Sequence, residues 1–233
     1  DLLFNICNRS LKRKHLDALN GAHIGSVPTM STTLSIIGAG NMARAIIHGA
    51  IDGQVLLPSQ IVVADPSDEA RSSFAELGCD VCAEASELPE CTHCLLAVKP
   101  QIFPLISGSV NAGVVYSIMA GIPISQIQES TGKSAVVRVM PNLPCQLGFG
   151  AAGLSYAPEV SADDVSLAFD LFNAIGIVEE VPESLMDAVT AVSGSGPAYI
   201  FLLAEAMIKG GVEAGLSEGT AISLVRHTIR GAA

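Results

Sequence analysis

The segment LSIIGAGNMA combines a short apolar run, a glycine-rich turn and the start of a helix, an arrangement that can bind a pyrophosphate. Gly38 permits the tight turn, Gly40 lets the backbone approach a diphosphate, and Ala43 allows the helix to pack against the strand. The helix N-terminus at Asn41 and Met42 then offers free N–H groups and the positive end of its dipole. An ordinary tight turn is the alternative, but the strand–turn–helix context favours dinucleotide binding.

An acidic residue after the next apolar run bears on which dinucleotide binds. Asp65 ends QIVVAD, roughly where a carboxylate accepts hydrogen bonds from the adenine ribose hydroxyls of NADH. The same carboxylate would repel the 2′-phosphate of NADPH, whereas Ser67 and Arg71 just beyond it could bind that phosphate. The sequence therefore leaves both cofactors open, NADPH or NADH.

A second glycine-rich segment, SGSGP, offers donors for an anion. Gly194 and Gly196 expose backbone N–H groups, and Ser193 and Ser195 add hydroxyls. Pro197 suits the first turn of a following helix, so a simple helix break and cap explains the segment equally well. From these residues alone the two interpretations stay open.

Lys99 precedes Pro100 at the carboxyl end of an expected parallel strand, the edge at which such sheets bind ligands. It is either a ligand contact or the first solvated residue after the strand, and we favour contact. The chain shows no convincing pairing of a nucleophile with a general base, and its five histidines are scattered. We therefore assign no catalytic side chain.

Four cysteines form two Cys-x-x-Cys pairs, which raises the question of a zinc site. The pairs Cys79 with Cys82 and Cys91 with Cys94 are closer together than paired zinc knuckles usually are. Cys79 and Cys82 fall where a strand is expected, and residues three apart on a strand point to opposite faces. We expect buried, apolar cysteines and no metal site.

Short apolar runs alternate with amphipathic helices from Leu34 onward. Ser67 and Ser161 are expected to cap two of these helices, and Gly78 to adopt a left-handed conformation after one of them. The runs are apolar on both faces, as buried parallel strands are, which predicts a doubly wound α/β sheet. The expected strands are LSIIG, QIVVAD, HCLLAVKP, VVYSIMAG and AVVRVMPN.

The chain divides into three expected parts. Residues 1–29 carry Arg9, Lys12, Arg13 and Lys14 and are expected to be an N-terminal extension, with a basic partner-binding or targeting arm as the lesser alternative. Residues 30–182 form the α/β domain. Residues 183–233 are rich in Ala, Leu, Ile and Gly and are expected to form a second, helical domain. The helical pattern runs to Ala233 without a stop signal, so we expect a truncated C-terminus.

Composition limits the partners of this 233-residue chain. Its 12 basic and 23 acidic residues give a formal charge of -11, which opposes binding to nucleic acid and anionic lipid. Hydrophobic residues make up 49% and charged ones 15%, which indicates burial in a homodimer or higher homo-oligomer. The longest apolar stretch, Pro197–Ile208, is short for a membrane span, so we expect no membrane segment. Without a signal-peptide pattern, reduced thiols and a cytoplasmic location are expected.

The ordered set GAGNMA, AVKP, RVMPNLP and AVSGSGPAYIF resembles pyrroline-5-carboxylate reductases over nearly all of residues 30–233. This resemblance implies a Rossmann-like NAD(P)-binding domain, a helical domain that interlocks with a second subunit, and reduction of 1-pyrroline-5-carboxylate to L-proline. Implied cofactor-binding residues are Gly38, Ala39, Gly40, Asn41, Met42, Val98, Lys99, Pro100, Ala120 and Gly121, beside the Asp65 and Ser67 discussed above. Implied substrate-side residues are Met140, Pro141, Asn142 and Ser193, Gly194, Ser195 and Gly196 at a helix start.

Two departures from the resemblance are visible. The family usually has MPNTPA where this chain has Leu143 and Cys145, so a threonine hydroxyl is missing from that loop. A segment of SPGGTT type, which the resemblance implies for carboxylate contacts, lies beyond Ala233. Alternative functions are a related β-hydroxyacid dehydrogenase or imine reductase, and a dinucleotide-binding fragment without catalysis. A cyclic imine needs no protein nucleophile, since its protonated carbon–nitrogen bond is already electrophilic.

Overall fold

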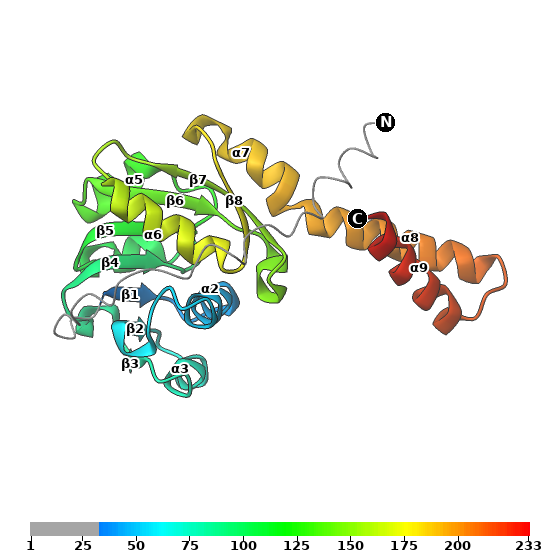
Figure 1. Cartoon of the computed structure of the whole chain (residues 1–233), viewed down its shortest axis with the longest axis horizontal. Helices are drawn as coiled ribbons and strands as arrows, with labels where there is room; N and C mark the ends of the chain where they lie inside the picture. Colours follow the sequence, from blue (N-terminus) through cyan, green and yellow to red (C-terminus); the bar gives the residue numbers. More distant parts are fainter. Residues whose placement is uncertain (1–32) are drawn as a thin grey trace, which may run out of the picture. The chain divides into compact units, whose positions relative to one another are not determined.

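Figure 1 shows the computed structural model of the chain, which describes residues 33–233. An eight-stranded sheet has the order β3-β2-β1-β4-β5-β6-β7-β8. Neighbouring strands are parallel except β6 and β7, which are antiparallel. The doubly wound, mainly parallel sheet predicted from the sequence is confirmed. The strands are β1 (Leu34–Ile37), β2 (Ile61–Ala64), β3 (Asp80–Cys82), β4 (Cys91–Leu96), β5 (Ala112–Ser117), β6 (Ala135–Met140), β7 (Gly150–Tyr156) and β8 (Gly176–Glu180).

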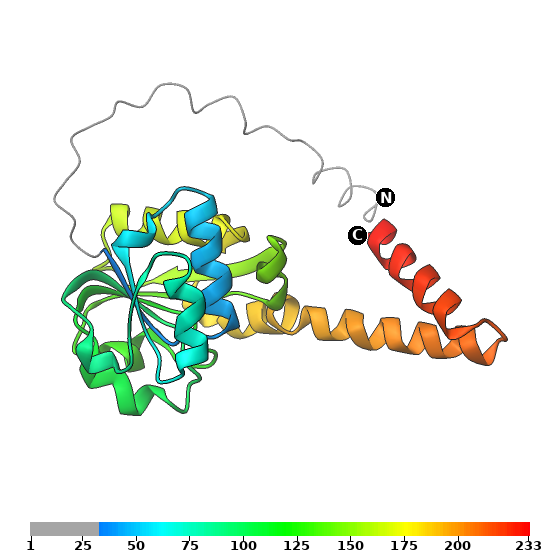
Figure 2. The same ribbon diagram turned by 90° about the horizontal axis from the view of Figure 1, so that it is seen from below.

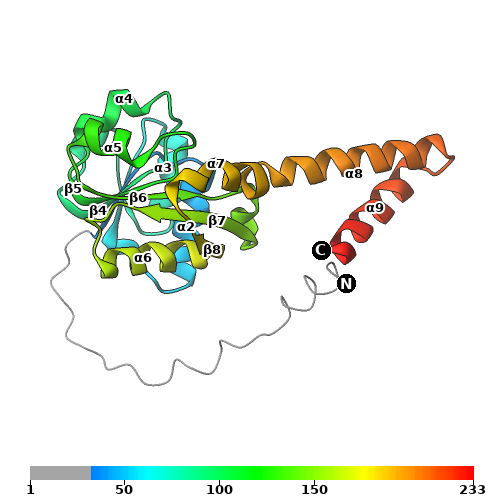
Figure 3. The same ribbon diagram turned by 90° about the horizontal axis from the view of Figure 1, so that it is seen from above.

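Helices cover both faces of this sheet. Figure 3 shows α4, α5 and α7 on one face and α6 on the other, where α6 contacts α2. Figure 2 shows the blue α2 and the cyan α3 side by side. The helices of this unit are α2 (Asn41–Asp52), α3 (Asp68–Ala75), α4 (Phe103–Ile106), α5 (Ile124–Thr131), α6 (Ala162–Asn173) and α7 (Met186–Val189).

The expected helix caps are present. The Ala70 N–H donates to the Ser67 hydroxyl at 3.3 Å, and the Asp164 N–H donates to the Ser161 hydroxyl at 3.2 Å. Each hydroxyl therefore satisfies one of the free N–H groups in the first turn of α3 or α6. Gly78 has φ +87°, the left-handed conformation expected after the first of these helices.

The strands are apolar on both faces because both faces are covered. All four residues of β1 and of β2 are buried. A polar cluster ties the sheet to α6: His93 Nε2 lies 2.8 Å from Asp164 Oδ1, and the Tyr116 hydroxyl donates to the Asp164 carbonyl at 2.8 Å. The rings of His93 and Tyr116 stack with centroids 5.2 Å apart. This cluster fixes α6 over β4 and β5.

The cysteines of the described part are free thiols. Cys94 is fully buried in β4, as expected, and Cys79 is buried immediately before β3. Cys82 is half-buried at the sheet edge. Within residues 33–233, no three His, Cys, Asp or Glu side chains converge as metal ligands would. The cysteines there instead fill apolar space in and beside the strands.

Two helices end the chain, α8 (Gly196–Glu213) and α9 (Glu218–Ala232). The turn between them contains Gly215 at φ +103°, and the Ser217 hydroxyl caps α9 by accepting from the Thr220 N–H at 3.2 Å. Ala221 and Val225 are buried in α9. Exposed apolar side chains on α8 are Tyr199, Ile200, Phe201, Leu202, Leu203, Met207 and Val212.

The helical run from Glu183 to Glu213 is longer than the apolar stretch seen in the sequence. It spans 31 residues, and its most apolar window has a mean hydropathy of 1.3, so by length and composition alone it could cross a membrane. Soluble proteins use equally apolar helices at subunit interfaces, so this finding is weak evidence for a membrane span.

Chain contacts group the described residues up to Ala198 into one compact unit and Tyr199–Ala233 into another. The limit at residue 183 inferred from composition stays a prediction. The expected extension, residues 1–29, lies outside the described residues.

Candidate functional site

The glycine turn is built as the sequence predicted. β1 ends at Ile37, and Gly38 follows with φ +103°, donating its N–H to the Ala64 carbonyl at 2.9 Å. A Cβ on Gly38 would lie 2.7 Å from the Ala97 carbonyl oxygen, so only glycine fits there. A Cβ on Gly40 would meet no described atom within 4 Å. The space in front of α2 is therefore open to a ligand.

The N-terminus of α2 lacks a side-chain cap among the described residues, because Gly40 occupies the cap position. The first N–H groups of α2, at Asn41 and Met42, therefore have no partner within the preceding turn of the helix. Aligned peptide dipoles make this end partly positive. The geometry suits a diphosphate.

Asp65 supports the turn directly. Its Oδ2 accepts the Ala39 N–H at 2.8 Å, and its Oδ1 accepts the Ser67 N–H at 2.9 Å. Arg71 donates to the Asp65 carbonyl and pairs with the exposed carboxylate of Asp68. Both oxygens of Asp65 thus already hold backbone groups, and a guanidinium lies beside them.

The expected nicotinamide-side residues follow β4 and β5 at the same edge of the sheet. The Ala97 N–H donates to the Ile37 carbonyl at 2.9 Å, which places the segment after β4 next to the glycine turn. The Ile118 N–H donates to the Leu96 carbonyl at 3.1 Å, so the segment after β5 adjoins it in turn. Gly121 has φ +73°. The residues thus placed are Val98, Lys99, Pro100, Ala120 and Gly121, of which Lys99 is exposed.

Asn142 connects the two segments expected beside the substrate. Its Nδ2 donates to the Ser193 carbonyl at 3.0 Å, and its Oδ1 accepts the Ala151 N–H at 2.9 Å. Because the side chain is buried, these hydrogen bonds are shielded from water. Met140 also touches this region, since a Cβ on Gly194 would lie 2.9 Å from Met140 Cε. Asn142 therefore brings the SGSGP segment to the edge that carries the glycine turn.

The SGSGP segment contains the start of α8 at Gly196, and a π-helical turn that the sequence did not predict precedes it. Thr190–Gly194 forms a π-helical turn that follows α7, and helical structure continues into α8 at Gly196. The Ser195 N–H donates to the Thr190 carbonyl at 2.7 Å, and the Ser193 hydroxyl donates to the Val189 carbonyl at 3.0 Å. The Ser195 N–H and the Ser193 hydroxyl are thus used within the chain, whereas the availability of the Gly194 and Gly196 N–H groups to an anion stays a prediction. Turns of the π-helical kind often occur at functional sites.

An ion pair near this edge was not predicted from the sequence. Arg138 in β6 and Glu183 form an ion pair, with Nη1 and Oε1 3.1 Å apart. Because 45 residues separate them, neither carries a local pattern that identifies the other. The only sequence signal is that Arg138 interrupts an apolar strand, where a buried charge needs a partner.

Three cavities lie near these residues, and the smallest, of about 330 Å³, is lined by Val189 and Ser193 among others. One, of about 720 Å³, lies beside α2 and the segment 145–148 and is lined by Asn41 and Arg44 among others. Another, of about 560 Å³, is lined by parts of α5, β7 and the residues after β8, and contains none of the predicted ligand residues. Among the expected cofactor-binding residues, Asn41 lines the cavity of about 720 Å³ and none lines that of about 560 Å³.

Comparison with known proteins identifies the family. Residues 183–233 match the family described as "Pyrroline-5-carboxylate reductase dimerisation", and residues 33–121 match "NADP oxidoreductase coenzyme F420-dependent". A pyrroline-5-carboxylate reductase of Synechocystis is 40% identical over 213 residues, which cover 88% of this chain and 79% of that protein.

Solved structures agree. A pyrroline carboxylate reductase of Plasmodium falciparum with NADP bound is 30% identical, with a TM-score of 0.75 over 88% of this chain and 78% of that one. A pyrroline-5-carboxylate reductase of Coxiella burnetii is 31% identical, with a TM-score of 0.77 over 86% of this chain and 78% of that one. With the glycine turn, the strand-edge loops and the SGSGP segment in the expected order, the chain belongs to the pyrroline-5-carboxylate reductase family.

Proposed function

We propose that this chain reduces 1-pyrroline-5-carboxylate to L-proline with NADPH or NADH. The observation that carries the proposal is the hydrogen bond from Asn142 to the Ser193 carbonyl. It brings the serine- and glycine-rich segment to the sheet edge where the uncapped N-terminus of α2 is available for a diphosphate. Membership of the family supports the reaction and disfavours the dehydrogenase and non-catalytic alternatives.

The residues of the chain bind and orient rather than react. When bound, the dihydronicotinamide supplies the hydride that adds to the imine carbon. The turn Gly38–Met42 would bind the diphosphate, and the loops with Val98, Lys99 and Gly121 would border the ring. Met140, Asn142 and the Ser193–Gly196 segment would form the substrate side. Fixing both partners at reacting distance removes much of the entropic barrier, which is why no protein nucleophile is required.

Arg71 favours NADPH over NADH in this proposal. Its guanidinium lies beside Asp65, at the position expected for the adenine ribose. A guanidinium binds phosphate through paired, charge-assisted hydrogen bonds. The carboxylate of Asp65 is occupied by the N–H groups of Ala39 and Ser67, which lowers its availability to ribose hydroxyls. The Ser67 hydroxyl caps α3 and could add a further contact.

Residues 183–233 are proposed to form a homo-oligomer interface, at least a dimer. The family described for these residues is a dimerisation family, and α8 carries many exposed apolar side chains. We expect this interface, rather than lipid, to cover the apolar run Glu183–Glu213. A cytoplasmic location also stays a proposal, supported by the free thiols of the described residues.

The test is oxidation of NADPH and of NADH by the purified chain with and without the cyclic imine, followed by absorbance of the reduced nicotinamide. We expect imine-dependent oxidation, faster with NADPH, and proline as the product. Nucleotide binding without oxidation at any imine concentration would instead support the non-catalytic alternative. Sedimentation of the same preparation without detergent measures its mass, and we expect the mass of at least a dimer.

A further inference from the structure

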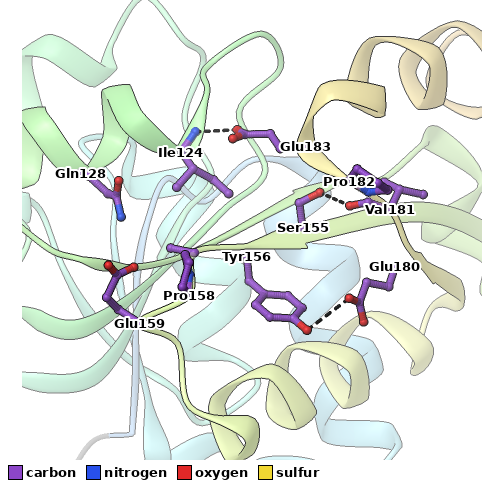
Figure 4. Close-up of a pocket in the computed structure, with 11 residues that line it drawn as sticks. Ile124, Gln128, Ser155, Tyr156, Pro158, Glu159, Glu180, Val181, Pro182 and Glu183 are labelled. Atoms are coloured by element: carbon purple, nitrogen blue, oxygen red, sulfur yellow. Dashed lines mark hydrogen bonds between the residues drawn. The ribbon is translucent and has the colours of Figure 1, made fainter.

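Glu183 joins three segments that are far apart in the sequence. It begins a short 3-10 helix, Glu183–Leu185, just after β8. Its Oε1 accepts the Ile124 backbone N–H at 2.7 Å and a hydrogen bond from Arg138 Nη1 at 3.1 Å. Figure 4 shows the carboxylate turned toward the backbone nitrogen of Ile124, in a cavity that Ser155 and Tyr156 also line. One carboxylate oxygen therefore links α5, β6 and the segment leading to α7.

The contact with Ile124 supplies a cap that α5 otherwise lacks. Ile124 is the first residue of α5, and the cap position is taken by Pro123, which has no side-chain acceptor. A carboxylate at this end both accepts a free N–H and opposes the positive end of the helix dipole. The start of α5, and with it the end of the preceding loop that contains Ala120 and Gly121, is thereby fixed.

The contact with Arg138 fixes the end of β6. Arg138 is 8% exposed, and a guanidinium that is nearly buried is costly to leave unpaired. Two residues later β6 ends at Met140, and Asn142 then bonds to the Ser193 carbonyl. The chain from Glu183 runs through α7 into the same π-helical turn. Glu183 and Asn142 thus connect the two strand-edge loops to the serine- and glycine-rich segment at separate points.

We propose that Glu183 is a positioning residue for hydride transfer. It sets the spacing between the loop expected to border the nicotinamide and the segments expected to bind the imine, without touching either ligand. The inference rests on the proposed function. It predicts a defect in the chemical step with little effect on nucleotide affinity, because the diphosphate would be bound elsewhere, at Gly38–Met42.

The test compares Glu183→Ala, Glu183→Gln and the control Glu180→Gln. Glu180 borders the same cavity, and within residues 33–233 its side chain accepts a hydrogen bond only from the exposed Tyr156 hydroxyl, at 3.2 Å. We expect Glu183→Ala to lower kcat on the order of 10- to 100-fold, since displacements of about 1 Å cost as much. The KM for NADPH should change by less than about threefold, as for a site whose diphosphate contacts are intact. Glu183→Gln keeps an acceptor for the Ile124 N–H and should recover part of kcat, and Glu180→Gln should match the wild type.

A folded Glu183→Ala variant with wild-type kcat would overturn the proposal. Equal losses in kcat and nucleotide affinity, together with a large fall in melting temperature, would also overturn it, since they indicate a structural role alone. The same two outcomes in Glu183→Gln, the milder change, would overturn the proposal as well.

Fluorescence of bound NADPH separates this inference from the proposed function. If the wild type does not reduce the imine, a change in nicotinamide fluorescence at unchanged affinity in Glu183→Ala, absent in Glu180→Gln, would still support positioning. Identical fluorescence in all the proteins would refute it.

Discussion

Gly38 and Gly40 are two residues apart, yet we expect glycine to matter at each for a different reason. Gly38 has a left-handed backbone and faces the Ala97 carbonyl, so its requirement comes from the fold. Gly40 has φ −72°, which other residues adopt readily, and open space around it. In the proposed function the diphosphate of the cofactor would occupy that space, which is why we expect glycine to matter there.

Replacing these glycines by alanine should therefore separate stability from binding. Gly38→Ala should lower the free energy of unfolding by about 1–3 kcal/mol, the usual cost of such backbone strain, with further loss from the contact with Ala97. Gly40→Ala should leave the melting temperature near that of the wild type and weaken NADPH binding on the order of tenfold. Denaturation and nucleotide titration on both variants check this; the reverse pattern would contradict it.

Arg71 provides a second prediction. Arg71→Ala should raise the KM for NADPH on the order of tenfold, the value of a lost hydrogen bond to a charged group, and leave the KM for NADH nearly unchanged. Asp68→Ala is the matched control, because it removes the ion-pair partner of Arg71 but keeps the guanidinium. Equal effects of Arg71→Ala on both cofactors would argue against a 2′-phosphate contact.

The last two strands of the sheet, β7 and β8, were not predicted from the sequence. β1, β2, β4, β5 and β6 were predicted because they are continuous β-branched or apolar runs. β7 contains GAAGLSY and β8 contains GIVEE, which have little intrinsic strand preference. Their pairing depends on a contact between residues far apart in the sequence. A Cβ on Gly176 would lie 2.1 Å from the Gly150 carbonyl oxygen, so glycine at position 176 allows the two backbones to approach. Such a contact has no local signature.

The position of the candidate site was predictable to a similar extent. The fold class alone predicts that residues after the strands lie at the carboxyl edge of the sheet, as the segments from Ala97 and Ile118 do; their contact with a ligand stays a prediction. The π-helical turn was not predictable, because small residues such as those of SGSGP indicate a break as readily as a widened turn. The partnership of Glu183 with Ile124 was also inaccessible, since it joins residues 59 positions apart.

The contact between α6 and β4 should make stability depend on pH. Burial raises the pKa of Asp164, but hydrogen bonds from Ser161 and His93 outweigh it, so the net pKa lies below the ordinary 3.8. A lowered native pKa contributes stability that is present above the unfolded value and is lost as pH falls through the native value.

Asp164→Asn should thus destabilise the protein by about 1 kcal/mol at neutral pH, the net worth of a hydrogen bond. The difference from the wild type should shrink as the pH falls below about 4. Urea unfolding at several pH values measures it, with Asp163→Asn as the exposed neighbour for control. A difference that grows in acid would contradict this assignment.

At the scale of the whole molecule, the C-terminal helices are too apolar to be left in water. Phe201 is 60% exposed and Leu202 is 67% exposed within one chain, and patches of this kind mark interaction surfaces. The family match over residues 183–233 points to a second copy as the partner.

The double variant Phe201→Glu with Leu202→Glu should therefore shift the protein from oligomer to monomer, because burying two carboxylates at an apolar interface is strongly unfavourable. Sedimentation at micromolar concentration measures the change. Lys209→Glu, an exposed charge reversal on the same helix, should leave the oligomer intact. An unchanged mass for the double variant would place the interface elsewhere.

The buried thiols described above have a consequence under oxidative stress. Burial, aided by the charge of Asp80, raises the pKa of Cys79 to about 11, and burial raises the pKa of Cys94 to about 12 although the nearby Ser35 hydroxyl acts to lower it. The thiolate is the form that peroxides and alkylating agents attack, and so little of it exists at neutral pH that these reactions are slow. These two cysteines should therefore resist oxidation, and sulfenic acid should not form there when peroxide accumulates in the cell.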